Sequence, residues 1–337
     1  MTRRPVTALV MSEPTIRQLF DAARFERLHA LAQLDRPEPL TELGSPASRA
    51  RLRELEVMIT GWGCPPLTGE VLDAAPRLRA VLHAAGTVKT HLTDASCWER
   101  GILVTSAASA NAMPVAEYTL AAILHSGKRV SAFAEAYRRQ GADSAWRERV
   151  TAGSNYGRVV GIVGLSHTGR RVAHLLRSFD LTVLASDPYA TEADAQALGT
   201  TLVPLPDLLR RSDIVTLHAP SLPETRNLLN ADRLALLPDH ATVINTARGS
   251  LIDTDALTAE CVSGRLSAIL DVTDPEPLPV DSPLFGLPNV QLTPHIAGAM
   301  GTEVHRLAEA ALDELERYAK GLPPAYPIHM RDLARIA

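Results

Sequence analysis

The stretch Arg158-Val-Val-Gly-Ile-Val-Gly-Leu-Ser-His-Thr-Gly169 decides the fold of this chain. Its apolar part is typical of a buried strand, and a glycine turn then leads into the start of a helix. Gly164, Ser166 and Gly169 occupy the key positions of a G-x-G-x-x-G fingerprint. The first glycine makes the tight turn, the second normally lets amides approach a pyrophosphate, and the third lets the helix pack on the strand. Ser166 adds a Cβ at the second position, so the fingerprint is imperfect.

A carboxylate follows at the spacing that a dinucleotide site needs. Asp187 comes 18 residues after Gly169, at the end of a predicted strand over Thr182–Ser186. An acid there accepts hydrogen bonds from both ribose hydroxyls and repels a 2′-phosphate. No arginine immediately follows it, so the sequence favours NAD, and NADP is less favoured. The alternative is that Asp187 only opens a turn before Pro188.

Short β-type runs alternate with helical stretches on both sides of this motif. Such alternation predicts an α/β fold in which helices cover both faces of parallel sheets. The predicted strands are Val6–Met11, Val57–Thr60, Leu78–His83, Ile102–Thr105, Arg158–Gly164, Thr182–Ser186, Asp213–His218, Ala241–Thr246, Ser267–Val272 and Val290–Thr293. The predicted helices include Ile16–Leu34, Arg49–Leu55, Thr168–Phe179, Thr254–Arg265 and an amphipathic helix over Gly301–Lys320.

A long helix is predicted between the two α/β runs. Asn111-Ala-Met-Pro114 offers a cap followed by an early proline, and apolar positions continue to about Arg139. A helix of this length would cross between lobes or pair with a second subunit. A helix that packs on its own domain explains the pattern equally well.

Composition bounds the function. The 337 residues suggest two domains, and 46% hydrophobic with 21% charged residues is typical of a globular protein. A net charge of −4 provides no field for nucleic acid or an anionic membrane, and no run of 18 apolar residues predicts a membrane span. The three cysteines lie far apart, which argues against a disulfide framework or a metal site. We therefore expect a cytoplasmic protein without a metal.

Polar residues end three of the later predicted strands. Arg248 follows the strand Ala241–Thr246, Asp271 lies at the end of Ser267–Val272 with Glu276 between prolines after it, and His295 follows a proline after Val290–Thr293. Ligands of open α/β sheets bind beyond the carboxyl ends of the strands. An arginine, a carboxylate and a histidine there predict an anion clamp and an oriented acid–base group. Singly, each has a plain structural explanation: a surface ion pair, a solvated loop charge or a buried histidine.

These motifs resemble the D-isomer-specific 2-hydroxyacid dehydrogenases, which include phosphoglycerate, glyoxylate and D-lactate dehydrogenases. The resemblance is most specific in Asn245-Thr-Ala-Arg-Gly249, in Asp271 to Pro277 and in Thr293-Pro-His-Ile-Ala-Gly298. It implies two Rossmann/flavodoxin-like, doubly wound parallel-sheet domains with a cleft between them. Residues 1–105 and 297–337 would form the substrate-binding domain and 106–296 the NAD-binding domain. A helix and arm at about 111–150 would form a homodimer.

The resemblance also implies residue roles. Arg248 would bind the substrate carboxylate and keto oxygen, His295 would exchange a proton with that oxygen, and Glu276 would hold His295 and favour its protonated form. Weaker matches at Leu217-His-Ala-Pro220 add His218 as a residue beside the cofactor, with a weaker claim than His295 to be the base. The implied cofactor-binding residues are Gly164, Ser166, His167, Thr168, Gly169, Asp187, His218, Ala219, Thr246, Ala247, Asp271 and Gly298.

The loop Ala84-Ala-Gly-Thr-Val-Lys-Thr90 departs from the family pattern. Family members bind the substrate carboxylate with backbone amides here, so Gly86, Thr87, Val88 and Lys89 are the implied substrate contacts. Lysines are rare in this chain (Lys89, Lys128 and Lys320 among 34 basic residues), and we hypothesise that Lys89 adds a cation for the substrate. A surface lysine pointing away is the alternative.

The function predicted is hydride transfer between nicotinamide C4 and C2 of a small anionic 2-hydroxy or 2-keto acid. One alternative is the same fold acting on an unusual anion, such as a phosphonate or phosphite. The other is a NAD-sensing, corepressor-like binding protein, which would bind NADH without turning over an acid.

Overall fold

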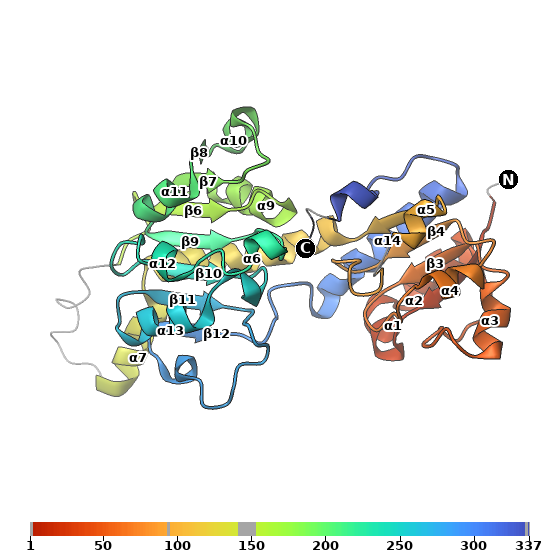
Figure 1. Ribbon diagram of the computed structural model, residues 1–337, viewed down its shortest axis with the longest axis horizontal. Helices are drawn as coiled ribbons and strands as arrows, with labels where there is room; N and C mark the ends of the chain where they lie inside the picture. Colours follow the sequence, from red (N-terminus) through yellow and green to blue (C-terminus); the bar gives the residue numbers. More distant parts are fainter. Residues whose placement is uncertain (1–2, 93–94, 141–152, 334–335, 337) are drawn as a thin grey trace. The chain divides into compact units, whose positions relative to one another are not determined.

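A computed structural model describes residues 3–92, 95–140, 153–333 and 336. These residues form two compact units, one of residues 1–111 and 299–337 and the other of residues 112–298. We call them unit 1 and unit 2. Each contains an all-parallel sheet between helices, as predicted for an α/β protein (Figure 1).

The described part of unit 1 has a five-stranded sheet in the order β2-β1-β3-β4-β5. This is the flavodoxin-like order. Separate apolar clusters cover its two faces, and α14 supplies Leu307, Leu312 and Leu315 to one of them. Its strands and main helices are β1 (Val6–Val10), β2 (Gln33–Leu34), β3 (Val57–Thr60), β4 (Ala80–His83), β5 (Leu103–Ser106), α1 (Glu13–Leu19), α2 (Ala22–Leu31), α3 (Pro46–Leu52), α4 (Gly69–Asp73), α5 (Ser96–Glu99) and α14 (His305–Ala319).

The described part of unit 2 has a seven-stranded sheet in the order β12-β11-β10-β9-β6-β7-β8. The order reverses between β6 and β9, which is the switch point where doubly wound sheets bind ligands. Its elements are α6 (Ala108–Gly127, entering from unit 1), α7 (Val130–Gln140), β6 (Val159–Val163), α9 (His167–Leu176), β7 (Thr182–Ser186), α10 (Glu192–Leu198), β8 (Thr201–Leu202), α11 (Leu205–Arg211), β9 (Ile214–Leu217), α12 (Ala231–Leu234), β10 (Thr242–Asn245), α13 (Thr254–Val262), β11 (Ser267–Leu270) and β12 (Val290–Leu292).

Two of the predicted helices are each two helices in the structure. The single helix expected over Ile16–Leu34 is α1 and α2, because Phe20 is extended and the Asp21 carboxylate caps a new helix at the Arg24 amide. The long helix expected over 111–139 begins at Ala108 and breaks after Gly127, where Arg129 has a φ of 52°. Asn111 is not its cap, and Pro114 lies inside the helix.

Asn111 instead joins the two places where the chain crosses between the units. Its Oδ1 accepts a hydrogen bond from the Ala299 amide at 2.9 Å. The last residue of the first segment of unit 1 is thereby tied to the first residue of the second. This tertiary bond explains why a good capping residue lies within a helix.

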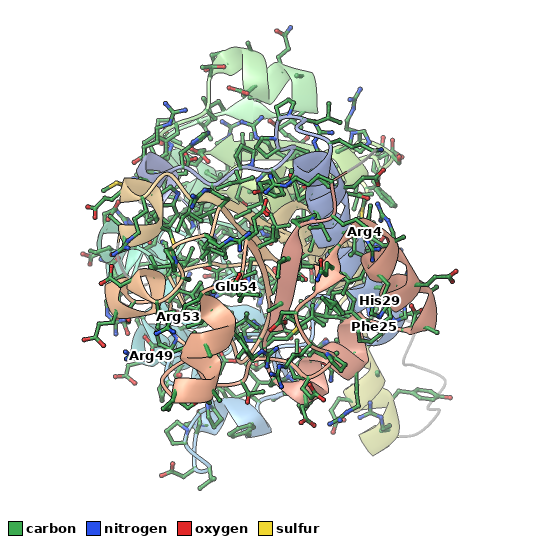
Figure 2. All side chains as sticks on the ribbon, turned by 90° about the vertical axis from the view of Figure 1, so that its right-hand side faces the viewer. Arg4, Phe25, His29, Arg49, Arg53 and Glu54 are labelled. Carbon is green, nitrogen blue, oxygen red and sulfur yellow. The ribbon has the colours of Figure 1, made fainter. Side chains whose placement is uncertain are left out.

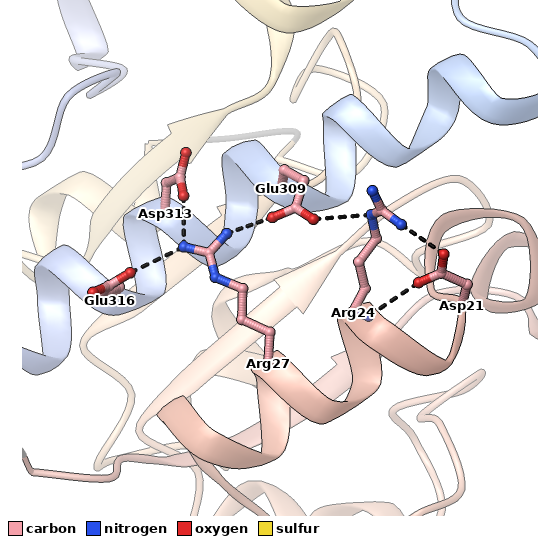
Figure 3. A network of polar contacts seen from close by, with 6 residues as sticks. All are labelled: Asp21, Arg24, Arg27, Glu309, Asp313 and Glu316. Atoms are coloured by element: carbon pink, nitrogen blue, oxygen red, sulfur yellow. Dashed lines mark hydrogen bonds and ion pairs between the residues drawn. The ribbon is translucent and has the colours of Figure 1, made fainter.

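Side chains on the outside of unit 1 fasten its helices. Arg4 donates to the carbonyls of His29 and, at 2.9 Å, Ala32, at the end of α2 (Figure 2). Arg27 of α2 binds Glu309, Asp313 and Glu316 of α14 (Figure 3). The C-terminal segment then covers the edge of β5, where the Ile328 amide donates to Val104 at 2.8 Å. An edge strand covered in this way is protected from pairing with other chains.

Candidate active site

The glycine turn after β6 lies at the switch point of unit 2. Gly164 has a φ of 95°, and a Cβ on it would lie 2.6 Å from the Ala219 amide nitrogen. A Cβ on Gly169 would lie 2.0 Å from the Gly164 carbonyl oxygen. Both positions therefore require glycine, for the reasons the fingerprint gives. The turn and the start of α9 fit a bound pyrophosphate, because a helix N-terminus attracts anions.

Ser166 occupies the place of the middle glycine and caps α9. Its hydroxyl oxygen accepts a hydrogen bond from the Gly169 amide at 3.4 Å. His167 and Thr168 form the first turn of that helix. Desolvation lowers the pKa of His167, as do the charges of Arg171 and Arg170, so this ring is neutral at pH 7. Any anion held here thus meets backbone dipoles and no imidazolium charge.

Asp187 directly follows β7 and also organises the glycine turn. Its Oδ2 accepts from the Leu165 amide at 2.7 Å and its Oδ1 from the Tyr189 amide at 2.8 Å. The carboxylate is half-buried and fixed against the turn. The sequence suggested two explanations, a ribose acceptor and a turn residue. Its bond to the Tyr189 amide shows that it does act in the turn, and the ribose role stays a prediction.

The end of β9 packs against the glycine turn through its backbone. The His218 ring is buried and lies 3.0 Å from the Thr216 hydroxyl, and burial lowers its pKa to about 3. The carbonyl carbon of His218 would lie 2.8 Å from a Cβ on Gly164, and its Cβ would lie 3.4 Å from a Cβ on Gly169, so His218 packs directly against the turn. A buried neutral ring of this kind is poorly placed as a base, and the role of His218 beside the cofactor stays a prediction.

The turn after β10 carries Arg248. Asn245, fully buried, accepts from the Ala247 amide at 3.0 Å and donates to the Arg248 carbonyl at 2.8 Å. Burial lowers the pKa of Arg248, and the charge of Glu276 acts in the opposite direction. The sequence motif contained Asn245, but its bracing role could not be predicted because turn geometry decides it.

Gly249 brings this turn against the loop that carries Glu276. A Cβ on Gly249 would lie 2.0 Å from the Thr273 carbonyl carbon, so only glycine permits the approach. The loop is also held by an ion pair of 3.2 Å between Arg226 and Asp274. Thr254 donates to the Asp274 carbonyl at 2.6 Å.

Glu276 and His295 form a pair at the same edge of the sheet. The Nδ1 atom of His295 lies 2.7 Å from Oε1 of Glu276, and the side chains are 50% and 44% exposed. His295 has a φ of 57°, a left-handed conformation that is unusual for a residue with a Cβ. The structure thus brings Arg248, Glu276 and His295 together in unit 2, since the carboxyl ends of parallel strands share one edge.

The remaining predicted cofactor residues lie along this edge. Thr246 bonds through its hydroxyl to Thr119 of α6 at 3.1 Å. Asp271 follows β11 and is 2% exposed, with its carboxylate bonded to the loop around His295. Ala247 and Gly298 are half-buried in the loops after β10 and β12. Their contacts with a cofactor stay predictions.

The loop after β4 lies in unit 1. Val88 is buried in the core, Gly86 approaches the Asn111 side chain, and the Lys89 amide donates to the Thr87 hydroxyl at 3.3 Å. The Lys89 ammonium donates to the Ile336 carbonyl at 2.5 Å. It therefore holds the C-terminal segment, and a role toward a substrate stays a prediction.

The residues matched by a known family model span this edge of unit 2. The NAD binding domain of the D-isomer specific 2-hydroxyacid dehydrogenases matches residues 120–297. The chain belongs to this family. That family membership confirms the resemblance seen in the sequence, and an NAD-binding domain supports a nicotinamide cofactor.

Individual relatives agree with the family. The chain is 35% identical over 264 residues to glyoxylate reductase of Korarchaeum cryptofilum, covering 77% of this chain and 79% of that protein. It is 37% identical over 252 residues to D-3-phosphoglycerate dehydrogenase of Mycobacterium tuberculosis, covering 74% of this chain and 46% of that protein. The chain thus spans about half the length of the phosphoglycerate dehydrogenases it matches.

Solved structures share the fold. The TT0316 protein from Thermus thermophilus has a TM-score of 0.75 at 31% identity, covering 96% of this chain and 99% of that one. A phosphoglycerate oxidoreductase from Rhizobium etli has a TM-score of 0.83 at 24% identity, covering 98% and 100%, and is similar in fold. Within the described residues, no helix is long and apolar enough to cross a membrane, and no cluster of His, Cys, Asp or Glu is arranged to hold a metal.

Proposed function

We propose that this protein is a NAD-dependent oxidoreductase that interconverts a small 2-hydroxy acid and the corresponding 2-keto acid. The observation that carries the proposal is the 2.7 Å contact between His295 Nδ1 and Glu276 Oε1, in the same unit as the desolvated Arg248. Relatives named glyoxylate reductase and D-3-phosphoglycerate dehydrogenase support a small acid as substrate.

His295 serves as the proton donor and acceptor. A carboxylate can only accept a hydrogen bond, so Glu276 fixes the ring with the proton on Nδ1. This leaves Nε2 to meet the oxygen on C2 of the substrate. In the reduction direction the imidazolium gives its Nε2 proton to that oxygen while Glu276 balances the charge, and in oxidation the neutral ring takes the proton back.

Arg248 binds the carboxylate and the keto oxygen of the substrate. Its guanidinium stays charged and presents donors in a fork that matches a carboxylate. Because the side chain is half-buried, its attraction for an anion is stronger than at a fully exposed site. The Asn245 brace and the Gly249 contact keep this charge next to the Glu276 loop.

The glycine turn and the β7 end hold the cofactor in this proposal. The amides of His167 and Thr168 meet the pyrophosphate, Asp187 accepts from the ribose hydroxyls, and Thr246, Ala247 and Asp271 border the nicotinamide end. When bound, nicotinamide supplies or accepts the hydride. A carboxylate at Asp187 repels a 2′-phosphate, so NADH should bind more tightly than NADPH, and Asp187→Ala should narrow that difference in titrations of protein fluorescence.

The protein acts as a homodimer in this proposal. The part of the predicted arm over residues 141–150 lies outside the described residues, whereas α7 exposes Val130 and Tyr137 on its surface. An exposed apolar helix face favours association with a second copy. Sedimentation velocity should give twice the chain mass, and a monomer at micromolar concentration would contradict this.

Oxidation of NADH with a panel of small 2-keto acids tests the activity. We expect turnover, and a loss of about 100-fold or more in kcat for His295→Ala with NADH binding unchanged. His240→Ala is the matched control, because His240 also has a left-handed backbone (φ 67°) and is exposed in unit 2. NADH binding without turnover of any acid, or full activity in His295→Ala, would refute the proposal.

A further inference from the structure

The loop that carries His295 needs support, because its backbone is in an unfavourable conformation. A left-handed φ of 57° costs free energy in a residue with a Cβ. The His295 amide donates to the Asp271 carbonyl at 2.9 Å and to the Thr293 carbonyl at 3.1 Å. These bonds fix the backbone of the loop from the side of β11.

The Asp271 carboxylate holds the same loop from both sides of His295. Its Oδ1 accepts from the Thr293 hydroxyl at 2.6 Å and the Ile296 amide at 2.8 Å, and its Oδ2 accepts from the Ala297 amide at 2.9 Å. A buried carboxylate needs such donors, and bonds to a charged acceptor are strong. The position of Asp271 therefore sets the position of the His295 backbone.

A further hydrogen bond reaches this loop from α6. The Tyr118 hydroxyl lies 2.7 Å from the Thr293 hydroxyl oxygen. Thr293 has already committed its proton to Asp271, which can only accept, so Tyr118 must be the donor. Burial and the charge of Asp271 raise the pKa of Tyr118 against a lowering by the bond to Thr293, so the phenol keeps its proton at pH 7. The donors thus run in one direction, from Tyr118 to Thr293 to Asp271.

We propose that Tyr118 is a positioning residue for the proton transfer by His295. This role rests on the proposed function, since it acts on the same histidine. Hydrogen bonds in a chain strengthen one another, so losing the first donor weakens the bond between Thr293 and Asp271. The His295 loop then samples positions in which the ring no longer faces Glu276 and the substrate oxygen, and small misplacements of a reacting group are costly.

Removal of one oxygen tests the role. Tyr118→Phe should lower kcat by about 3- to 10-fold, the effect of one hydrogen bond, while KM for the keto acid and Kd for NADH stay within about 2-fold. Tyr156→Phe is the matched control, because that ring is 81% exposed in the same unit, and its kcat should equal that of the wild type. Equal kcat in Tyr118→Phe and the wild type overturns the proposal.

A double-mutant cycle on the Tyr118 and Thr293 hydroxyls distinguishes a role in positioning His295 from general damage to the fold. Thr293→Val should lower kcat at least as much as Tyr118→Phe, Thr293→Ser should restore most of it, and the double variant should be no worse than Thr293→Val alone. If the free-energy losses in kcat of the two single variants simply add in the double variant, the proposed chain of hydrogen bonds from Tyr118 through Thr293 is overturned. The rescue by serine keeps the test valid if valine disturbs packing.

An NMR signal from the contact between His295 and Glu276 tests the positioning role of Tyr118 without any turnover. In protein with ¹⁵N-labelled histidine, the Nδ1–H proton of His295 bonded to Glu276 should give a downfield resonance that is absent in His295→Ala. Tyr118→Phe should broaden or shift it, and Tyr156→Phe should not. If the wild type turns over no acid, the proposed function fails, while an unchanged resonance in Tyr118→Phe overturns the positioning role by itself.

Discussion

Two buried histidines should make the stability of unit 1 depend on pH. His83 ends β4, His91 lies in the loop after it, and the side chains are 3% and 1% exposed. Their rings lie 4.4 Å apart, and both approach the Thr60 hydroxyl, His83 at 2.9 Å and His91 at 3.4 Å. Two neutral rings can share one hydroxyl in this way, whereas two charged rings at this distance repel each other.

The size of the effect follows from the pKa values. Burial, and secondly the charge of His91, lowers the pKa of His83 to about 3, and burial lowers the pKa of His91 to about 4. In the unfolded chain both titrate near pH ~6.5, so below that pH the unfolded state binds protons that the folded state refuses. The free energy of unfolding is therefore undiminished above pH ~6.5 and decreases as the pH is lowered below that value. At pH 5 the loss is about 2 kcal/mol for each histidine.

Urea unfolding at pH 8 and pH 5 measures this loss. Trp62 and Trp98 report on unit 1 by fluorescence, in a background with Trp146→Phe, because Trp146 lies outside the described residues. The wild type should lose about 4 kcal/mol more than His83→Asn/His91→Gln between the two pH values. His29→Asn is the control, because His29 is exposed on α2, and it should behave as the wild type. An equal loss in the double variant and the wild type would refute the reasoning.

Two further predictions concern the site and the helix pair of unit 1. Gly249→Ala places a Cβ 2.0 Å from the Thr273 carbonyl carbon, so kcat in the keto-acid assay should fall by about 10-fold or more, whereas Gly286→Ala, with no atom within 4 Å, should be neutral. Comparable rates in the two variants would show that the close approach is not needed. Arg27→Met leaves Glu309, Asp313 and Glu316 facing one another (Figure 3) and should destabilise unit 1 by about 1–2 kcal/mol in urea, most strongly at low salt. The exposed Arg17→Met serves as its control, and equal stability of the two variants would count against the network.

The edge of the sheet that carries the candidate site could be predicted from the sequence. In a parallel sheet, the residues that directly follow each strand all lie at the same edge. A buried strand such as Ala241–Thr246 can be recognised in the sequence by its run of apolar residues, and the polar residues that follow such strands lie together. Arg248, Glu276 and His295 were predicted in this way, and the structure places them at one edge of the unit 2 sheet, while their catalytic roles stay a proposal. The spacing of Asp187 from Gly169 predicted a ribose acceptor, which stays a prediction, and the structure shows that its carboxylate braces the glycine turn.

What remained hidden depends on partners that are far apart along the chain. Tyr118 and Thr293 are 175 positions apart, and nothing local in either segment pairs them. The start of α6 was misplaced because Asn111 has a local pattern typical of a cap but a tertiary partner, Ala299. The break between α1 and α2 is different, since Asp21 is visible in the sequence as a capping residue and the continuous apolar spacing masked it.

The division of unit 1 between two segments of the chain also has a consequence for how the protein is made. A ribosome completes residues 1–111 first, but the core of unit 1 lacks Leu307, Leu312 and Leu315 until α14 is synthesised. Residues 112–298 are complete before that, so the segment made second is the first that can fold, against the usual N-terminal-first order. During this interval the nascent β1, β3 and β4 carry unburied apolar faces. The yield of the protein should therefore depend on chaperones that shield them until the C-terminal helix arrives.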